Sequence, residues 1–276
     1  MTMLTTCPGC DSVALHPLAL ATDLKPADHE KWGEDVLVRD PAFASCSGCG
    51  LVFARRRQSA AVSQTYYDAF QELEHREYAV YPPPEQFITQ QTLYAAALGE
   101  VLDRELVFAP HHRVLNIRAE CGMHLLRLRE VHGITDLYGL DHFDSNVRYG
   151  QHDLRLPHMA LLPPQLNRVP FDPPTYDVVL VNHLLTHALD LSAVFGFLRS
   201  ILAPDGVLVL YGEENHRSFL KKDPLPRVNN YHKQLFTEDS LLKVCGVHGW
   251  DARVVHCFRH AIPWATAKNT LVVVAK

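Results

Sequence analysis

The sequence lacks a hydrophobic run long enough to cross a bilayer. Its longest apolar stretches, such as VVLVNHLLTHAL at residues 178–189, are too short and too polar for a membrane span. The opening MTMLTTCPGCD lacks the basic segment followed by an apolar segment that marks a secretory signal. We therefore expect a cytoplasmic protein with no membrane partner.

Positive charge is scarce as well. The chain has 26 Lys and Arg against 31 Asp and Glu, which gives a net charge of -5 at pH 7. A dedicated nucleic-acid binder is usually basic, so we do not expect a nucleic-acid partner. Arg55, Arg56 and Arg57 could contact phosphate, but a solvated run of charge is the commoner explanation.

A disulfide framework is not expected either, because the chain has seven cysteines, an odd number, and no secretory signal. What is present is a globular composition. The 276 residues, 47% of them hydrophobic, suffice for one large domain with a small appendage. Three cysteines are interpreted as small buried hydrophobic residues: Cys121, Cys245 and Cys257.

The other four cysteines form two CxxC pairs. Cys7 and Cys10 lie in CPGC, and Cys46 and Cys49 lie in CSGCG. A two-residue spacer lets one turn present two thiolates to one metal, and zinc prefers four thiolates in a tetrahedron. Gly50 suits the left-handed backbone that such a turn often needs. The spacing predicts a structural zinc site, with four unrelated buried thiols as the alternative.

Short apolar runs alternate with helical patterns from residue 113 onward. The runs RVLNI, DLYGLD, YDVVLVN and GVLVLYG are typical of buried strands. This alternation predicts an α/β fold with a mostly parallel sheet covered on both faces. The last runs, DARVVHCFR and NTLVVVAK, predict an antiparallel pair. Upstream, residues 59–79 and 85–106 have helical patterns separated by three prolines.

Four segments, in this order, are similar to those of a known family: CSGCGLVFARRRQS followed by YYDAF, then VPFDPPTYDVVLVNHLLTHALD, LRSILAPDGVLVLYGEEN and YHKQLFTEDSLLKVCGVHGW. The chain resembles the class I S-adenosylmethionine-dependent methyltransferases that carry an amino-terminal zinc-binding module and methylate sugars and other small molecules. The resemblance implies a Rossmann-like seven-stranded sheet with an antiparallel last strand, and a zinc-ribbon-like module. It divides the chain into a zinc-binding module (1–58), a helical linker or lid (59–108) and a methyltransferase-like Rossmann domain (109–276).

The family's first strand ends in an acidic residue and continues into a loop with three alternating glycines. Aligning RVLNIRAECG places Asn116 on the acidic position and Gly122 on the third glycine, so both are implied cofactor contacts. Arg118 and Glu120 fall on the first two glycines. Their side chains would project toward the cofactor or redirect the loop, and their opposite charges could pair across it.

The rest of the implied cofactor site follows the next strands. Asp141 ends DLYGLD, where the resemblance implies a carboxylate for the two ribose hydroxyls, with a turn-forming or helix-capping aspartate as the alternative. Asn182 ends YDVVLVN, at the lip where open sheets bind ligands.

Two histidines are candidate catalytic bases, His183 and His232, and Tyr231 could assist. The alternative for each is a hydrogen-bonded polar residue at a loop or helix end. His183 and His187 are four residues apart, which would put two rings on one helix face. The family carries histidines in this stretch without a catalytic metal, so we do not expect a metal there.

The sequence leaves two functions open. The resemblance implies methyl transfer from S-adenosylmethionine to a small-molecule acceptor, with structural zinc as the second cofactor. Asn116, Arg118 and Glu120 depart from the family pattern within one loop, and they favour the alternative of an inactive methyltransferase-fold protein that binds or assembles with a protein partner. An RNA-modifying enzyme is disfavoured by the acidic charge.

Overall fold

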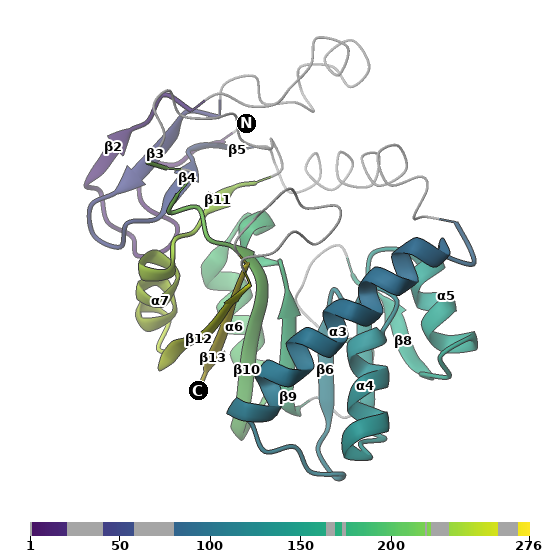
Figure 1. Cartoon of the computed structure of the whole chain (residues 1–276). Coiled ribbons are helices and arrows are strands. Elements are labelled where there is room, and N and C mark those ends of the chain that lie inside the picture. Colours follow the sequence, from purple (N-terminus) through teal and green to yellow (C-terminus); the bar gives the residue numbers. More distant parts are fainter. Residues whose placement is uncertain are drawn as a thin grey trace.

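Figure 1 shows a computed structural model of the chain. The structure describes residues 2–20, 41–57, 80–163, 169–172, 175–218, 220–221, 232–258 and 270–276. The helix expected at residues 59–79 lies outside these ranges, as does Tyr231. Over the ranges that are described, no helix has the length and apolar character that a membrane span requires.

A seven-stranded sheet forms the centre of the molecule. Its strands are β6 (Val114–Ile117), β7 (Leu137–Asp141), β8 (His158–Leu161), β9 (Tyr176–Asn182), β10 (Leu202–Glu214), β12 (Ala252–Phe258) and β13 (Thr270–Ala275), in the spatial order β12-β13-β10-β9-β6-β7-β8. The strands from β10 to β8 run parallel, and β13 is antiparallel to both of its neighbours. The predicted α/β sheet with an antiparallel last strand is confirmed. The edge strand β8 was not predicted, because only Met159 of its four residues is buried.

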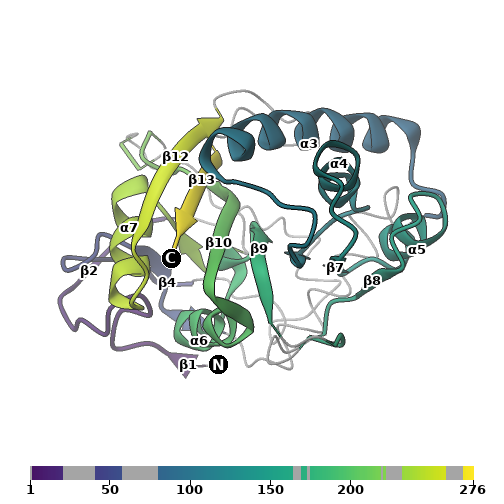
Figure 2. The same ribbon diagram turned by 90° about the horizontal axis from the view of Figure 1, so that it is seen from below.

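Helices cover both faces of the sheet (Figures 1 and 2). They are α3 (Glu85–Glu105), α4 (Met123–His132) and α5 (Asp144–His152) on one face, and α6 (Leu191–Ile201) and α7 (Glu238–Val247) on the other. Along β9, Val178 and Leu180 join the core beneath α3 and α4, whereas Val179 and Val181 join the core beneath α6 and α7. Since neighbouring side chains point to opposite faces, a strand buried on both sides reads as one apolar run.

The amino-terminal segment forms a small sheet that a late part of the chain completes. Its strands β2 (Leu15–Pro17), β3 (Phe43–Cys46) and β4 (Val52–Ala54) pair with β11 (Gln234–Leu235) in the order β11-β4-β3-β2, and β1 (Thr2–Met3) pairs with β5 (Arg56–Arg57). Leu51 and Phe53 share one hydrophobic cluster with Leu241 and Val244 of α7. The small sheet is therefore packed directly against the larger domain (Figure 1).

Arg57 anchors this packing. Its Nε donates a hydrogen bond to the carbonyl of Ala54 at 3.0 Å, and its Nη1 donates to the carbonyl of Leu189 at 2.6 Å. The side chain is buried, and burial lowers the pKa of its guanidinium to about 10. The expectation of a solvated charge run is therefore wrong for Arg57, because two of its nitrogens donate to main-chain carbonyls on the two sides of the contact.

Candidate functional site

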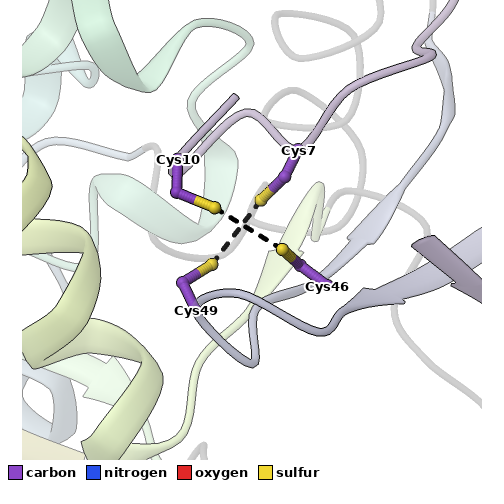
Figure 3. A group of neighbouring side chains, drawn as sticks. All are labelled: Cys7, Cys10, Cys46 and Cys49. Atoms are coloured by element: carbon purple, nitrogen blue, oxygen red, sulfur yellow. Dashed lines mark hydrogen bonds between the residues drawn. The ribbon is translucent and has the colours of Figure 1, made fainter. Parts of the chain in front are cut away.

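The four paired cysteines converge on one point (Figure 3). The Sγ atoms of Cys7 and Cys49 are 3.6 Å apart, those of Cys10 and Cys46 are 3.5 Å apart, and all four lie within 4.8 Å of one another. A tetrahedral zinc with bonds of about 2.3 Å would hold its sulfurs about 3.8 Å apart. The cluster fits a zinc-binding module, and its four thiols leave no open coordination position.

The turns around the cysteines prepare the thiols for a cation. The Gly9 amide donates a hydrogen bond to Sγ of Cys7 at 3.4 Å, and Gly50 has φ 78°, the left-handed backbone expected after the second pair. Hydrogen bonding from the Cys7 thiol lowers the pKa of Cys49 to about 5, while the same contact and burial raise the pKa of Cys7. Thiolate character thus develops inside the cluster, as a metal requires.

The loop after β6 keeps its left-handed backbone despite its side chains. Arg118, Glu120 and Gly122 have φ values of 59°, 53° and 91°. Only glycine adopts this region without cost, so the two charged residues are held there against a penalty of about 1 kcal/mol each. A Cβ at Gly122 would also lie 2.7 Å from Cδ1 of Leu156, so the end of that side chain would have to shift.

The two charged side chains tie this loop to the end of β9. The Arg118 guanidinium donates a hydrogen bond to the carbonyl of His183. The Asn182 amide donates to the Arg118 carbonyl at 3.3 Å and to Oε1 of Glu120 at 3.4 Å. Burial and the adjacent Asp141 raise the pKa of Glu120 to about 8, and the charge of Arg118 opposes this shift. The carboxyl of Glu120 therefore takes up a proton near neutral pH.

Asp141 lies at the end of β7, as predicted, and is almost fully buried. Its carboxylate accepts hydrogen bonds from the Glu120 amide at 2.9 Å, the Phe143 amide at 3.1 Å and the Asn146 side chain at 2.9 Å. Burial raises the pKa of Asp141 above its ordinary value, and these donors offset only part of the shift. The contacts to Phe143 and Asn146 match the turn-forming alternative, and the ribose role stays a prediction.

Asn116 is completely buried beneath the loop. Its Oδ1 accepts a hydrogen bond from the Tyr211 hydroxyl at 3.0 Å, and its Nδ2 has no hydrogen-bond partner among the described residues. The carboxamide thus faces β10, and its role toward a cofactor stays a prediction, as does that of Gly122.

Three histidines gather beside this loop. His183 directly follows β9, His187 ends the 3-10 turn η1 (Leu185–His187), and His232 precedes β11. Their ring centroids are 4.8 Å apart for His183 and His187, 5.5 Å for His183 and His232, and 5.3 Å for His187 and His232. The expectation of two rings on one helix face is wrong, because the segment is a 3-10 turn whose rings meet edge to face.

A buried glutamate that was not singled out in the sequence organises this turn. Glu213 accepts hydrogen bonds from the Leu185 amide at 2.7 Å, the Thr186 amide at 3.2 Å and the Thr186 hydroxyl at 2.7 Å. Its Oε2 lies 3.9 Å from Nδ1 of His183. The sequence feature that could have indicated Glu213 is the pair of glutamates at the end of an otherwise apolar strand. A carboxylate at such a position is buried only when hydrogen-bond donors surround it.

A family model described as "Methyltransferase domain" matches residues 53–255. The search of curated proteins finds no match. Among solved structures, the chain is similar to the YcgJ protein from Bacillus subtilis, with 12% identity over 66% of this chain and 97% of that chain and a TM-score of 0.48.

Two further structures are similar at the same level. A SAM-dependent methyltransferase from Aquifex aeolicus is 16% identical, with 67% of this chain and 97% of that chain covered and a TM-score of 0.46. The glycopeptide N-methyltransferase MtfA, complexed with S-adenosyl-L-methionine, is 14% identical, with 67% and 93% covered and a TM-score of 0.46. The family model spans most of the chain. The chain belongs to the methyltransferase domain family and has the class I fold.

Proposed function

We propose that this chain is a methyltransferase-fold protein that closes its own cofactor site and works by binding a partner rather than by transferring methyl groups. The observation that supports this proposal is the hydrogen bond from the Arg118 guanidinium to the carbonyl of His183. It places a cation of the chain itself at the carboxyl edge of the sheet, where ligands of open α/β sheets bind.

Arg118 competes with the cofactor for that edge. S-adenosylmethionine carries an ammonium group, which also seeks carbonyl and carboxylate acceptors. An ammonium approaching the carbonyl of His183 must displace a guanidinium already bonded to it. In the family, glycine at this loop position leaves the space open for the backbone to approach the ligand.

Glu120 acts on the other half of the site. Its amide donates to Asp141, its carboxyl accepts from Asn182, and the neighbouring Asp141 raises the pKa of that carboxyl. Ribose hydroxyls would therefore meet a carboxylate that already accepts three hydrogen bonds, next to a second acidic group. The residues present do not fit the cofactor in the arrangement described.

The test replaces both side chains by glycine. Glycine adopts the left-handed backbone at positions 118 and 120 without strain, so the variant R118G/E120G should fold at least as stably as the wild type. We expect equilibrium dialysis with labelled S-adenosylmethionine to detect binding by R118G/E120G and none by the wild type. The matched control R118K/E120Q keeps the bulk of both side chains and should stay closed. No binding by R118G/E120G would contradict the proposal.

The second candidate is methyl transfer to a small-molecule acceptor. It is favoured by the retained left-handed loop and by Asp141 at the end of β7. Under this candidate, Asn116, Gly122, Asp141 and Asn182 would hold S-adenosylmethionine, and His183 or His232 would take the acceptor's proton. Wild-type binding that is lost in D141N would support this candidate over the first.

We further propose that Cys7, Cys10, Cys46 and Cys49 hold a structural zinc. The donor set is all thiol, the sulfur spacing suits a tetrahedron, and three of the four side chains lie in the main hydrophobic cluster with α7. Zinc would therefore stabilise the contact between the small sheet and the larger domain rather than take part in chemistry. The division at residues 58 and 108 remains a proposal of the same kind.

A further inference from the structure

We propose that His183, His187 and His232 form a second metal site, which binds a divalent transition-metal ion and leaves one coordination position for a ligand. The proposal goes beyond the proposed function and does not depend on whether S-adenosylmethionine binds. It rests on the geometry of the three rings, on the contacts that fix them and on their donor chemistry.

The ring geometry matches a shared ion. One ring nitrogen from each histidine lies within 4.8 Å of one from each of the others. For an ion bonded to three imidazoles at about 2.1 Å in tetrahedral directions, ring centroids would be about 5.3 Å apart and nitrogens about 3.4 Å apart. The three observed centroid distances range from 4.8 to 5.5 Å and so include the centroid spacing expected around an ion. Small side-chain rotations would bring the ring nitrogens to the spacing expected for ligands of one ion.

The backbone around the cluster is fixed before any ion arrives. Glu213 binds the amides of Leu185 and Thr186 and so holds the turn that separates His183 from His187. The segment that carries His232 is tied to the same turn, because the Lys233 amide donates to the Thr186 carbonyl at 2.8 Å. Ligands from two distant parts of the sequence are thus held together, which lowers the ordering cost of binding.

Glu213 also lies near the cluster. Its Oε2 is 3.9 Å from Nδ1 of His183, which is too far for a hydrogen bond but places an acidic group beside that ring. The positive charge of Arg118 opposes a cation at the site. Two acidic residues also face the cluster: Glu213 beside His183, and Glu214, a carboxyl oxygen of which lies within 4.8 Å of a ring nitrogen of His232.

The donor set differs from that of the cysteine cluster. Imidazole suits zinc, copper, iron and nickel, and three protein ligands leave a fourth position for water or a ligand oxygen. His183 and His187 retain partial solvent exposure, so such a ligand can reach the ion. An ion here would polarise that oxygen. The ion could do so even if the cofactor site is closed.

The test is metal loading of the full-length chain. The protein is dialysed against Co²⁺, its cobalt and zinc are counted by mass spectrometry, and the absorption spectrum separates the two sites. Co²⁺ on thiolates has a charge-transfer band in the near ultraviolet that Co²⁺ on imidazoles lacks. We expect one metal equivalent beyond that bound by the cysteines. It should be lost in H187Q and in H232Q, and kept in H111Q, which alters an exposed histidine outside the cluster.

A second measurement covers the case in which H187Q or H232Q fails to fold. Ring ¹⁵N NMR of the wild type, titrated with Zn²⁺, should shift three histidines together at one equivalent. The proposal is overturned if the wild type takes up no ion beyond the cysteine site, or if both variants bind as the wild type does. It is also overturned if E214Q loses the ion and H187Q keeps it, because Glu214, His216 and His232 form a neighbouring triad.

Discussion

Removing the charge of Glu120 should change how the stability of the protein depends on pH. Burial and Asp141 raise the pKa of this carboxyl in the folded state from the ordinary 4.5 to about 8. A carboxyl with a raised pKa holds its proton more tightly when folded. Its contribution to stability is therefore complete below the ordinary pKa and is lost as the pH rises to about 8. Glutamine at this position cannot ionise and should remove that loss.

The size of the expected change in stability follows from the size of the pKa shift of Glu120. Each pKa unit corresponds to about 1.4 kcal/mol, so ionisation of Glu120 would lower the free energy of unfolding by at most about 4 kcal/mol between pH 5 and pH 8. Because Glu120 keeps partial contact with solvent, we expect about half of that ceiling.

Urea unfolding of wild type and E120Q across this range measures the effect directly. The difference in free energy of unfolding between the two should grow in favour of E120Q as the pH rises. E130Q, which alters an exposed carboxyl on α4, provides the control and should show no such trend. A difference for E120Q that stays constant with pH would refute the argument that Glu120 is buried against Asp141.

Two further predictions concern stability. C46S should lose the metal of the cysteine cluster and unfold at a lower temperature, whereas C257S should keep the metal. Metal content and thermal unfolding measure both effects, and a C46S protein with full zinc content would contradict the assignment. Y211F should lower the free energy of unfolding by about 1–3 kcal/mol, since it leaves the buried Oδ1 of Asn116 without a donor. Y176F is the matched control, because the hydroxyl of Tyr176 is buried with no hydrogen-bond partner among the described residues, and an equal loss in both variants would refute the argument.

Most of the sheet was predictable from the sequence because burial on both faces leaves a strong signal. Six of its seven strands were predicted from apolar runs. Five of these are largely buried, whereas the edge strand β12 has no fully buried residue. The alternation of strands with helices indicates that most of the sheet is parallel. The seventh, β8, gave no signal, since one buried residue in four has no recognisable period. The cysteine cluster was predictable for a different reason. The two-residue spacer within each cysteine pair is the one that lets a single turn present two thiolates to one metal ion.

The details of the candidate site were less accessible. The alignment of Arg118 and Glu120 with glycine positions agrees with their left-handed backbone, but no rule of local sequence says that the Arg118 side chain reaches the carbonyl of His183. The position of His232 depends on β11, a two-residue strand that pairs with β4, about 180 residues earlier in the sequence. The role of Glu213 could be assigned only from the structure, in which its carboxylate accepts hydrogen bonds from the turn at Leu185. Such contacts join residues that are far apart in the sequence, so local sequence patterns do not indicate them.

Titration calorimetry of the wild-type, zinc-loaded protein with S-adenosylmethionine and with its demethylated product tests the central claim most directly. The account predicts no heat of binding with either ligand, because the Arg118 guanidinium already occupies the carbonyl of His183 and Asp141 is already hydrogen bonded. Saturable binding of either ligand at micromolar concentration would contradict it, and would show that the loop opens and that methyl transfer is the function to pursue.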